Sequence, residues 1–123
     1  MVCTEPLTLF HVEQDGSVTR FLLIGSWYET NAVGMAADGT KLRRRTVKAR
    51  ILAPWCWDFV QPDGYTGTGW TAKPGDYLVR GDVELPDGRR WSEIPRLFGC
   101  FGVVKEARDR RLGVEPHIYL EGE

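Results

Sequence analysis

The chain contains few residues of the types that catalyse reactions, and their spacing matches no common catalytic motif. Its only histidines, His11 and His117, lie near opposite ends of the 123 residues. Nucleophile elbows, phosphate-binding loops, dinucleotide-binding turns and His-Glu-x-x-His pairs do not occur. Cys3, Cys56 and Cys100 are odd in number and widely spaced. We therefore expect no disulfide, no metal site and no cofactor, with Cys56 and Cys100 as small buried side chains.

Acid–base catalysis by a carboxylate is the enzymatic alternative that the sequence leaves open. Asp58 follows Trp57 directly, and Asp82 lies beside the central Tyr77–Gly81 segment. A carboxylate packed beside indoles can have a raised pKa and act as a general acid or base. If the protein is an enzyme, Asp58 and Asp82 are the candidate catalytic residues. For Asp76 we expect a simpler role, capping a turn.

Five tryptophans are the most unusual feature of the composition. In an extended segment Trp55 and Trp57 would share a face, and Trp70 lies in a Gly/Thr-rich stretch where we expect exposure. Indoles offer large flat surfaces for stacking. The candidate aromatic face consists of Trp55, Trp57, Tyr65 and Trp70. The alternative is that indoles fill the core, which we expect for Trp27 and Trp91.

A run of six bases without any acid forms the second candidate surface. It comprises Lys41, Arg43, Arg44, Arg45, Lys48 and Arg50. Residues 1–40 carry one base against five acids, and residues 51–123 carry nine bases against twelve acids. A concentrated positive stripe can bind phosphates or an acidic partner. We take Arg44, Lys48, Arg50 and the later Arg80 as candidate ligand-binding residues; the alternative is a solubilising edge strand.

Four Asp-Gly pairs divide the chain at nearly regular intervals. They are Asp15-Gly16, Asp38-Gly39, Asp63-Gly64 and Asp87-Gly88. Asp-Gly accommodates the positive φ of tight hairpin turns. The pattern predicts a meander of hairpins, with at least three pairs in turns between neighbouring antiparallel strands.

The segments between these turns favour strands. Residues 46–52 alternate, with Val47 on one face and Lys48 and Arg50 on the other. We also expect a hairpin strand at residues 83–85, a helical turn at 92–95 and a final edge strand at 117–120. The charged residues 105–112 are expected to form a short helix or a solvated loop.

Composition sets the class of protein. Apolar residues make up 42% and charged residues 27% of the chain, as in soluble globular proteins. No apolar run approaches the length of a membrane span, and the first residues do not resemble a secretory signal, so we expect a cytoplasmic protein. We predict one domain over residues 1–123, mostly β, built as a small antiparallel barrel or roll with one or two short helices. The alternative is a two-layer α+β domain.

The segment from Lys73 to Gly81 resembles a motif of small uncharacterised phage and prophage proteins. In that family a Pro-Gly-Asp turn opens a strand of an aromatic, an aliphatic, Val, Arg or Thr, and Gly. Here it reads Pro-Gly-Asp-Tyr-Leu-Val-Arg-Gly, and Trp91 takes the place of a later aromatic residue. The resemblance covers residues 46–104. It implies an origin on a mobile element and a β-rich fold, and it lends no activity.

Three functions are compatible with these residues. The favoured one is a non-catalytic binding module that uses the aromatic face and the arginine stripe to bind a partner protein or a small anionic ligand. The second is a small β-barrel enzyme with a carboxylate in an aromatic pocket. The third is a single-stranded nucleic-acid binder, which the isoelectric point of about 6.1 disfavours. The sequence does not indicate the oligomeric state.

Overall fold

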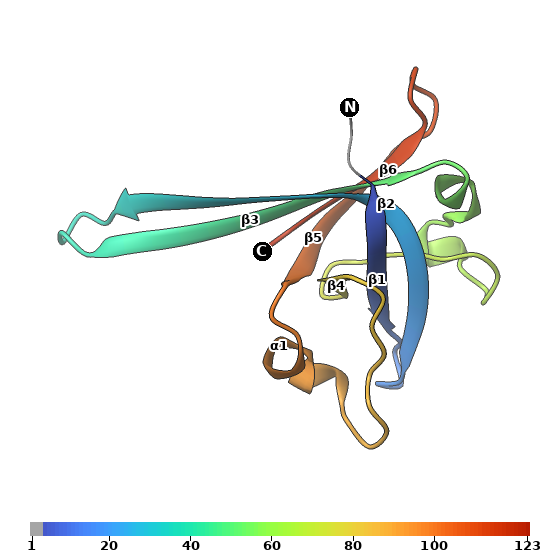
Figure 1. Ribbon diagram of the computed structural model, residues 1–123, viewed down its shortest axis with the longest axis horizontal. Coiled ribbons are helices and arrows are strands. Elements are labelled where there is room, and N and C mark those ends of the chain that lie inside the picture. Colours follow the sequence, from blue (N-terminus) through green and yellow to red (C-terminus); the bar gives the residue numbers. More distant parts are fainter. Residues whose placement is uncertain (1–3) are drawn as a thin grey trace.

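Six antiparallel strands close into a barrel in the order β1-β2-β3-β6-β5-β4 (Figure 1). This computed structural model describes residues 4–123, apart from the side chains of residues 42–44. The strands are β1 (Glu5–Val12), β2 (Val18–Met35), β3 (Lys41–Leu52), β4 (Tyr77–Arg80), β5 (Phe101–Arg110) and β6 (His117–Gly122). The described helices are α1 (Ile94–Leu97) and the 3-10 turns η1 (Trp55–Asp58), η2 (Pro62–Gly64) and η3 (Trp91–Glu93). The predicted mostly β antiparallel barrel is confirmed.

The barrel consists of two meanders, β1-β2-β3 and β4-β5-β6, joined where β1 pairs with β4 and β3 pairs with β6. Asp15-Gly16 and Asp38-Gly39 close the first two hairpins, with a glycine φ of 87° in each. Asp87-Gly88 forms a turn in the long connection between the neighbours β4 and β5, whereas Asp63-Gly64 lies in η2. Three pairs therefore connect neighbouring antiparallel strands, as predicted, although only two close tight hairpins.

Three local predictions are wrong, because tertiary contacts rather than local sequence preferences determine the structure of these segments. Residues 105–110 continue β5 instead of forming a helix or loop, because they pair with β6. β6 is flanked by β3 and β5, so it is not an edge strand. Residues 83–85 form no strand; Val83 and Leu85 pack from a loop against a small apolar cluster. The helical turn expected at 92–95 is present as η3 and α1.

The core lies inside the barrel and follows the alternation of its strands. In β3, Val47, Ala49 and Ile51 are buried while Lys48 and Arg50 are exposed, as predicted. A second apolar cluster, formed by Phe10, Tyr77, Val79 and Ile94, lies where α1 packs against the barrel. No helix in residues 4–123 is long and apolar enough to cross a membrane.

A fully buried carboxylate connects β1 to the turn that precedes β4. Asp76 Oδ1 accepts a hydrogen bond from the Val12 N–H at 3.1 Å. Its Oδ2 accepts from the Lys73 N–H at 3.0 Å and lies 2.7 Å from Nδ1 of His11. The Lys73 contact is the turn cap expected from the sequence. A buried carboxylate is tolerable only with such partners, so these contacts fix the end of β1 against β4.

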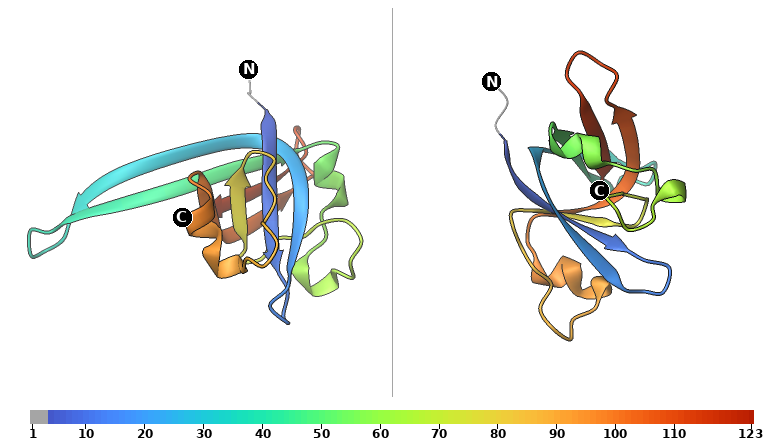
Figure 2. Two further views of the ribbon diagram at one scale, coloured as in Figure 1. Left: turned by 60° about the horizontal axis from the view of Figure 1, so that its bottom comes forward. Right: turned by 90° about the vertical axis from the view of Figure 1, so that its right-hand side faces the viewer.

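Beyond the barrel, β2 and β3 continue as a two-stranded arm. We define the arm as residues 31–45, in which β2 and β3 pair only with each other, from Asn31↔Arg45 to Met35↔Lys41. Figures 1 and 2 show it projecting well away from the other strands. The arm therefore presents surface that the barrel's own core does not cover.

Replacing Asp76 by Asn should destabilise the protein. An amide supplies one acceptor oxygen and an N–H₂ group, which would face a hydrogen-bond donor in this buried site. We expect D76N to lower the free energy of unfolding by about 3 kcal/mol, measured by urea denaturation. The matched control is D63N in the exposed turn η2, with a change of about 0.5 kcal/mol or less. Equal stabilities of the two variants would contradict this role of Asp76.

Candidate functional site

The four aromatic residues predicted to share a face are not brought together. Trp55-Cys56-Trp57 forms the 3-10 turn η1 rather than an extended segment, and Cys56 is its buried residue. Trp55 packs partly buried against the core, whereas Trp57 is 54% exposed. Trp70 is only 3% exposed, so its expected exposure is wrong. Its ring packs edge-on against Phe59, with centroids 4.8 Å apart, and its Nε1–H donates to the Trp55 carbonyl.

A glycine explains why Trp70 reaches the core from a Gly/Thr-rich loop. Gly69 has φ +77°, and a Cβ there would lie 2.2 Å from the Asp58 carbonyl oxygen. The Trp70 N–H donates to that same oxygen at 3.0 Å. The loop is therefore held close against η1, and the indole turns inward.

The other aromatic and cysteine predictions have mixed outcomes. Trp27 packs partly buried against the core, broadly as expected. Trp91 was expected in the core but is 37% exposed beside Tyr77, with ring centroids 6.2 Å apart. Cys56 is buried as expected, whereas Cys100 is exposed. Both differences occur in the β4–β5 connection, which runs over the outside of the barrel.

Tyr65 lies beside a buried polar pair, His11 and Asp76, that sequence reasoning did not find. It packs edge-on against His11, with centroids 5.7 Å apart. His11 is 5% exposed, and its Nε2 lies 3.7 Å from a Glu13 carboxylate oxygen. Burial raises the pKa of the Tyr65 phenol, and the charge of Glu13 raises it further. His11 and Asp76 are 65 residues apart in sequence, so no local motif could indicate the pair.

The His11–Asp76 pair has the geometry of an oriented imidazole but lacks a nucleophile. His11 lines an open hollow together with Glu13, Tyr65 and Lys73, whereas Asp76 is fully buried behind it. Within the described part of the chain, no hydroxyl or thiol hydrogen-bonds to the His11 Nε2. The geometry therefore accounts for the pair as a structural connection between β1 and β4.

The two candidate catalytic carboxylates lie on the surface. The side chain of Asp58 is exposed. Asp82 forms an ion pair with Arg20, which also donates to the Val83 carbonyl. Arg80, a candidate ligand-binding residue, is held by Glu5, and that hydrogen bond raises the pKa of the guanidinium. None of the three faces a closed pocket.

Because side chains alternate between the two faces of β3, the residues of the basic stripe do not all lie on the same face. Lys48 and Arg50 are exposed on the outer face of the barrel. Arg45 pairs with Glu29, and its guanidinium lies 5.4 Å from the Phe101 ring centroid. The side chain of Arg44 lies outside the described residues, and only its pairing with Ala32 in the arm is known.

On the outer face of the barrel, side chains of β6 and β5 extend the basic surface that starts with Lys48 and Arg50 on β3. Arg50, Tyr119 and Arg108 are directly paired across the three strands. The guanidinium carbons of Arg108 and Arg110 lie 5.9 and 5.1 Å from the Tyr119 ring centroid, within cation–π range. We call Lys48, Arg50, Arg108, Arg110 and Tyr119 the basic–tyrosine face. Its β5 members were missed because residues 105–112 were not expected to form a strand.

Two carboxylates interrupt the positive charge of this face. Glu121 is paired directly with Lys48. Glu106 accepts two hydrogen bonds from Arg108, at 2.7 and 3.0 Å, and these lower the pKa of its carboxyl. Within the described residues, no carboxylate forms an ion pair with Arg50 or Arg110. These two guanidinium groups are available to a ligand.

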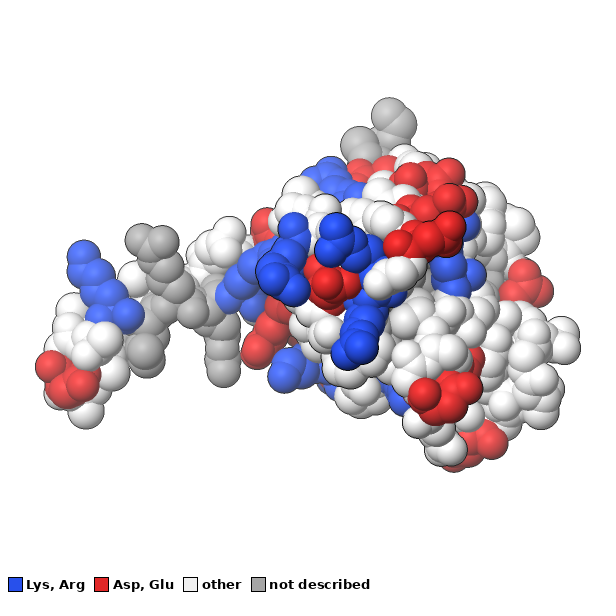
Figure 3. Space-filling view, turned by 90° about the horizontal axis from the view of Figure 1, so that it is seen from below, with Lys and Arg blue, Asp and Glu red and all other residues white. Residues whose placement is uncertain are grey.

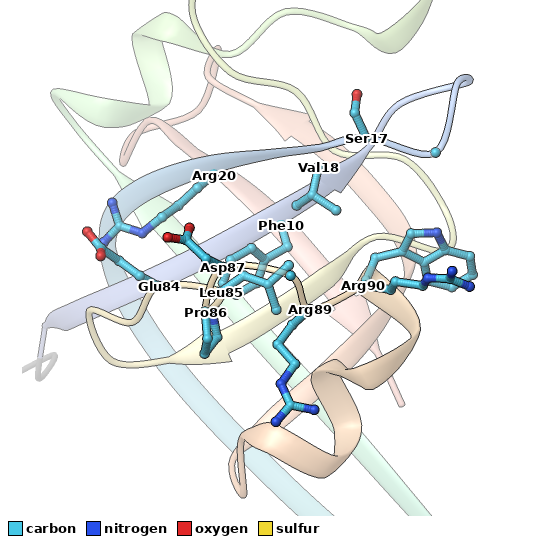
Figure 4. A pocket seen from close by; sticks show the side chains of 13 residues that line it. Phe10, Ser17, Val18, Arg20, Glu84, Leu85, Pro86, Asp87, Arg89 and Arg90 are labelled. Carbon is cyan, nitrogen blue, oxygen red and sulfur yellow. The ribbon is translucent and has the colours of Figure 1, made fainter.

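A second concave surface lies between the β1–β2 turn and the β4–β5 connection. Figure 4 shows Phe10 and Val18 in this groove of about 640 Å³, surrounded by charged side chains of both signs. Arg20 is already bound to Asp82, and Arg89 lies 3.5 Å from Glu93. Glu84 and Asp87 also line the groove and would repel an anionic ligand or an acidic partner, so it is a weaker candidate.

The fold and its surfaces define a small β-barrel protein with an exposed basic face and a projecting arm. The chain belongs to the family of unknown function DUF6751, which matches residues 2–123. No curated protein and no solved structure shows a significant match to it. The match covers nearly the whole chain and agrees with the expectation of an uncharacterised family.

The two described cysteines should differ sharply in reactivity. Burial raises the pKa of the Cys56 thiol, which lowers the fraction of the reactive thiolate at a given pH, whereas Cys100 is exposed. We expect iodoacetamide to label Cys100 well before Cys56 in the folded protein, as measured by peptide mapping. In denaturant the two should react at similar rates. Equal labelling in the folded protein would show that η1 does not bury Cys56.

Proposed function

We propose that this protein is a non-catalytic binding module whose basic–tyrosine face holds an acidic surface of a partner protein. The observation that carries the proposal is the cross-strand row Arg50–Tyr119–Arg108 with Arg110 beside it. Guanidinium groups bind carboxylates through paired, directional hydrogen bonds. The Tyr119 ring and its strand scaffold restrain the neighbouring arginines, which reduces the entropy lost on binding.

The shape of the face favours a protein over a small ligand. It lies on the outer side of three paired strands, and Arg110 at one end of the face also lines the open hollow beside Trp57. A small anion gains most of its affinity in a concave site. An exposed sheet face instead suits an extended partner surface that contacts several arginines together.

Charge patterning favours an acidic protein over a nucleic acid. Glu106 and Glu121 lie among the bases, where they would repel a continuous line of phosphates. The chain also has a net charge of −1, whereas nucleic-acid binders are usually basic overall. Separate carboxylates on a partner protein can instead contact the arginines without lying against Glu106 or Glu121.

The enzymatic alternative has less support, because Asp58 and Asp82 are exposed. The motif at Lys73–Gly81 supports an origin on a phage or another mobile element, where small proteins often act by binding. Location in the cytoplasm remains part of this proposal.

Charge reversal on β3 tests the proposed function. The probes are a fluorescent poly-glutamate peptide and a single-stranded oligonucleotide of equal charge, measured by fluorescence anisotropy. We expect the peptide to bind, and K48E/R50E to weaken its binding by about tenfold or more. Added salt should weaken wild-type binding, because exposed charges are screened over about 10 Å at 0.1 M.

The matched control is R90E/R96E, which changes the net charge equally at exposed sites in the β4–β5 connection. It should bind the peptide like the wild type. An equal loss in both double variants would contradict a localised site. Absence of peptide binding, or stronger binding of the oligonucleotide, would contradict the proposed class of partner.

A further inference from the structure

The arm carries apolar side chains on the face that continues the barrel's interior. Along β3 the interior face contains Val47, Ala49 and Ile51, and the pairing with β2 continues without a shift to the arm's end. By this alternation Val33 and Met35 lie on the same face. They are 68% and 70% exposed. The face of the arm that continues the barrel's interior therefore exposes these two apolar side chains to solvent.

A second apolar surface lies on the turn between β5 and β6. Leu112 and Val114 are fully exposed there, at 103% and 102%, and Trp57 of η1 is 54% exposed beside them. Together they border an open hollow of about 1000 Å³. We call this the tryptophan hollow. Exposed apolar side chains gathered in one concavity are typical of an interaction site.

Among the charged side chains that line the tryptophan hollow, the carboxylate of Glu115 is available to a base of a partner. Arg111 is paired with Asp109 and also donates to the Phe59 carbonyl. Arg110 also lines the hollow, with its guanidinium over the Tyr119 ring. Glu115 is exposed at the rim of the hollow. The arm offers the exposed Lys41, which is paired with Met35.

Charge also distinguishes the arm from the rest of the molecule. Residues 31–45 carry four bases and one acid, while the remaining residues carry twelve bases and sixteen acids. In Figure 3 the arm carries basic side chains beside an acidic group at its tip, basic side chains continue onto the adjoining part of the body, and several acidic ones lie toward the opposite end. The arm is therefore electrostatically complementary to the body of a second copy.

The arm and the tryptophan hollow lie on opposite sides of the barrel. In Figures 1 and 2 the arm projects to one side, and η1 lies at the other. An arm cannot reach the hollow of its own molecule. The geometry points to head-to-tail self-association, in which Val33 and Met35 of one copy enter the tryptophan hollow of the next and Lys41 approaches Glu115.

Such a contact joins two different surfaces, so each bound copy still offers one free arm and one free hollow. Contacts of this kind generate closed rings or open filaments rather than simple dimers. The proposal does not depend on Lys48 and Arg50, whose side chains lie on the other face of β3. Self-association should therefore survive K48E/R50E.

Two complementary variants provide the test, measured by sedimentation velocity over a wide concentration range. We expect the wild type to form oligomers larger than a dimer. V33E/M35E disrupts only the arm and L112E/V114E only the hollow, and each alone should be monomeric. Mixed together, the two variants should form a one-to-one dimer, because one supplies an intact hollow and the other an intact arm. L22E, at another exposed apolar site, is the control and should assemble like the wild type.

Circular dichroism must first show that each variant is folded, and serine in place of glutamate provides a milder pair at the same positions. A monomeric wild type would overturn the proposal. So would a hollow variant that still assembles, because this would indicate an arm-to-arm contact. Two folded, monomeric variants that fail to associate when mixed would also overturn it.

Discussion

The hydrogen bonds of the buried Asp76 carboxylate are the constraint on which the architecture depends. They connect the end of β1, through Val12 and His11, to the turn at Lys73 that starts β4. This junction is one of the two places where the N-terminal and C-terminal meanders meet. A carboxylate without these partners would not remain buried. The seam between β1 and β4 therefore combines this polar contact with backbone pairing, whereas β3 and β6 meet through backbone pairing at the other seam.

Closure of the second seam creates the candidate site. β3 brings Lys48 and Arg50, β6 brings Tyr119, and β5 brings Arg108 and Arg110. The same alternation that buries Val47, Ala49 and Ile51 directs these bases outward. The face is thus a direct consequence of burying the opposite side of the strands. The arm follows from the greater length of β2 and β3, which continue to pair after their other neighbours have ended.

Sequence reasoning identified the fold class because hairpin turns and strand alternation are local signals. The Asp15-Gly16 and Asp38-Gly39 turns and the two faces of β3 were predictable in this way. The strand at residues 105–110 was not predictable, because its charged sequence lacks apolar alternation and it forms a strand by pairing with β6 across a short turn. The buried Trp70 and exposed Trp91 show that an indole's exposure depends on tertiary contacts. His11 and Asp76 could not be paired from residues so distant in sequence.

For the site, sequence reasoning found two of its five residues. Lys48 and Arg50 stood out as members of a dense run of bases, and alternation indicated their exposure. The other three residues, Tyr119, Arg108 and Arg110, do not belong to a dense run of bases in the sequence. They come together only through the register between β5 and β6. The expected aromatic face failed because η1 is a 3-10 turn, which separates Trp55 from Trp57.

Mapping an acidic peptide onto the protein by nuclear magnetic resonance would test the central claim most directly. In a titration of isotope-labelled protein with poly-glutamate, amide signals report which residues change environment. The basic–tyrosine face predicts saturable shifts centred on Arg50, Tyr119 and Arg108, with little change around His11 or in the groove beside Phe10. Shifts centred on either of those hollows, or no saturable shifts, would contradict the account.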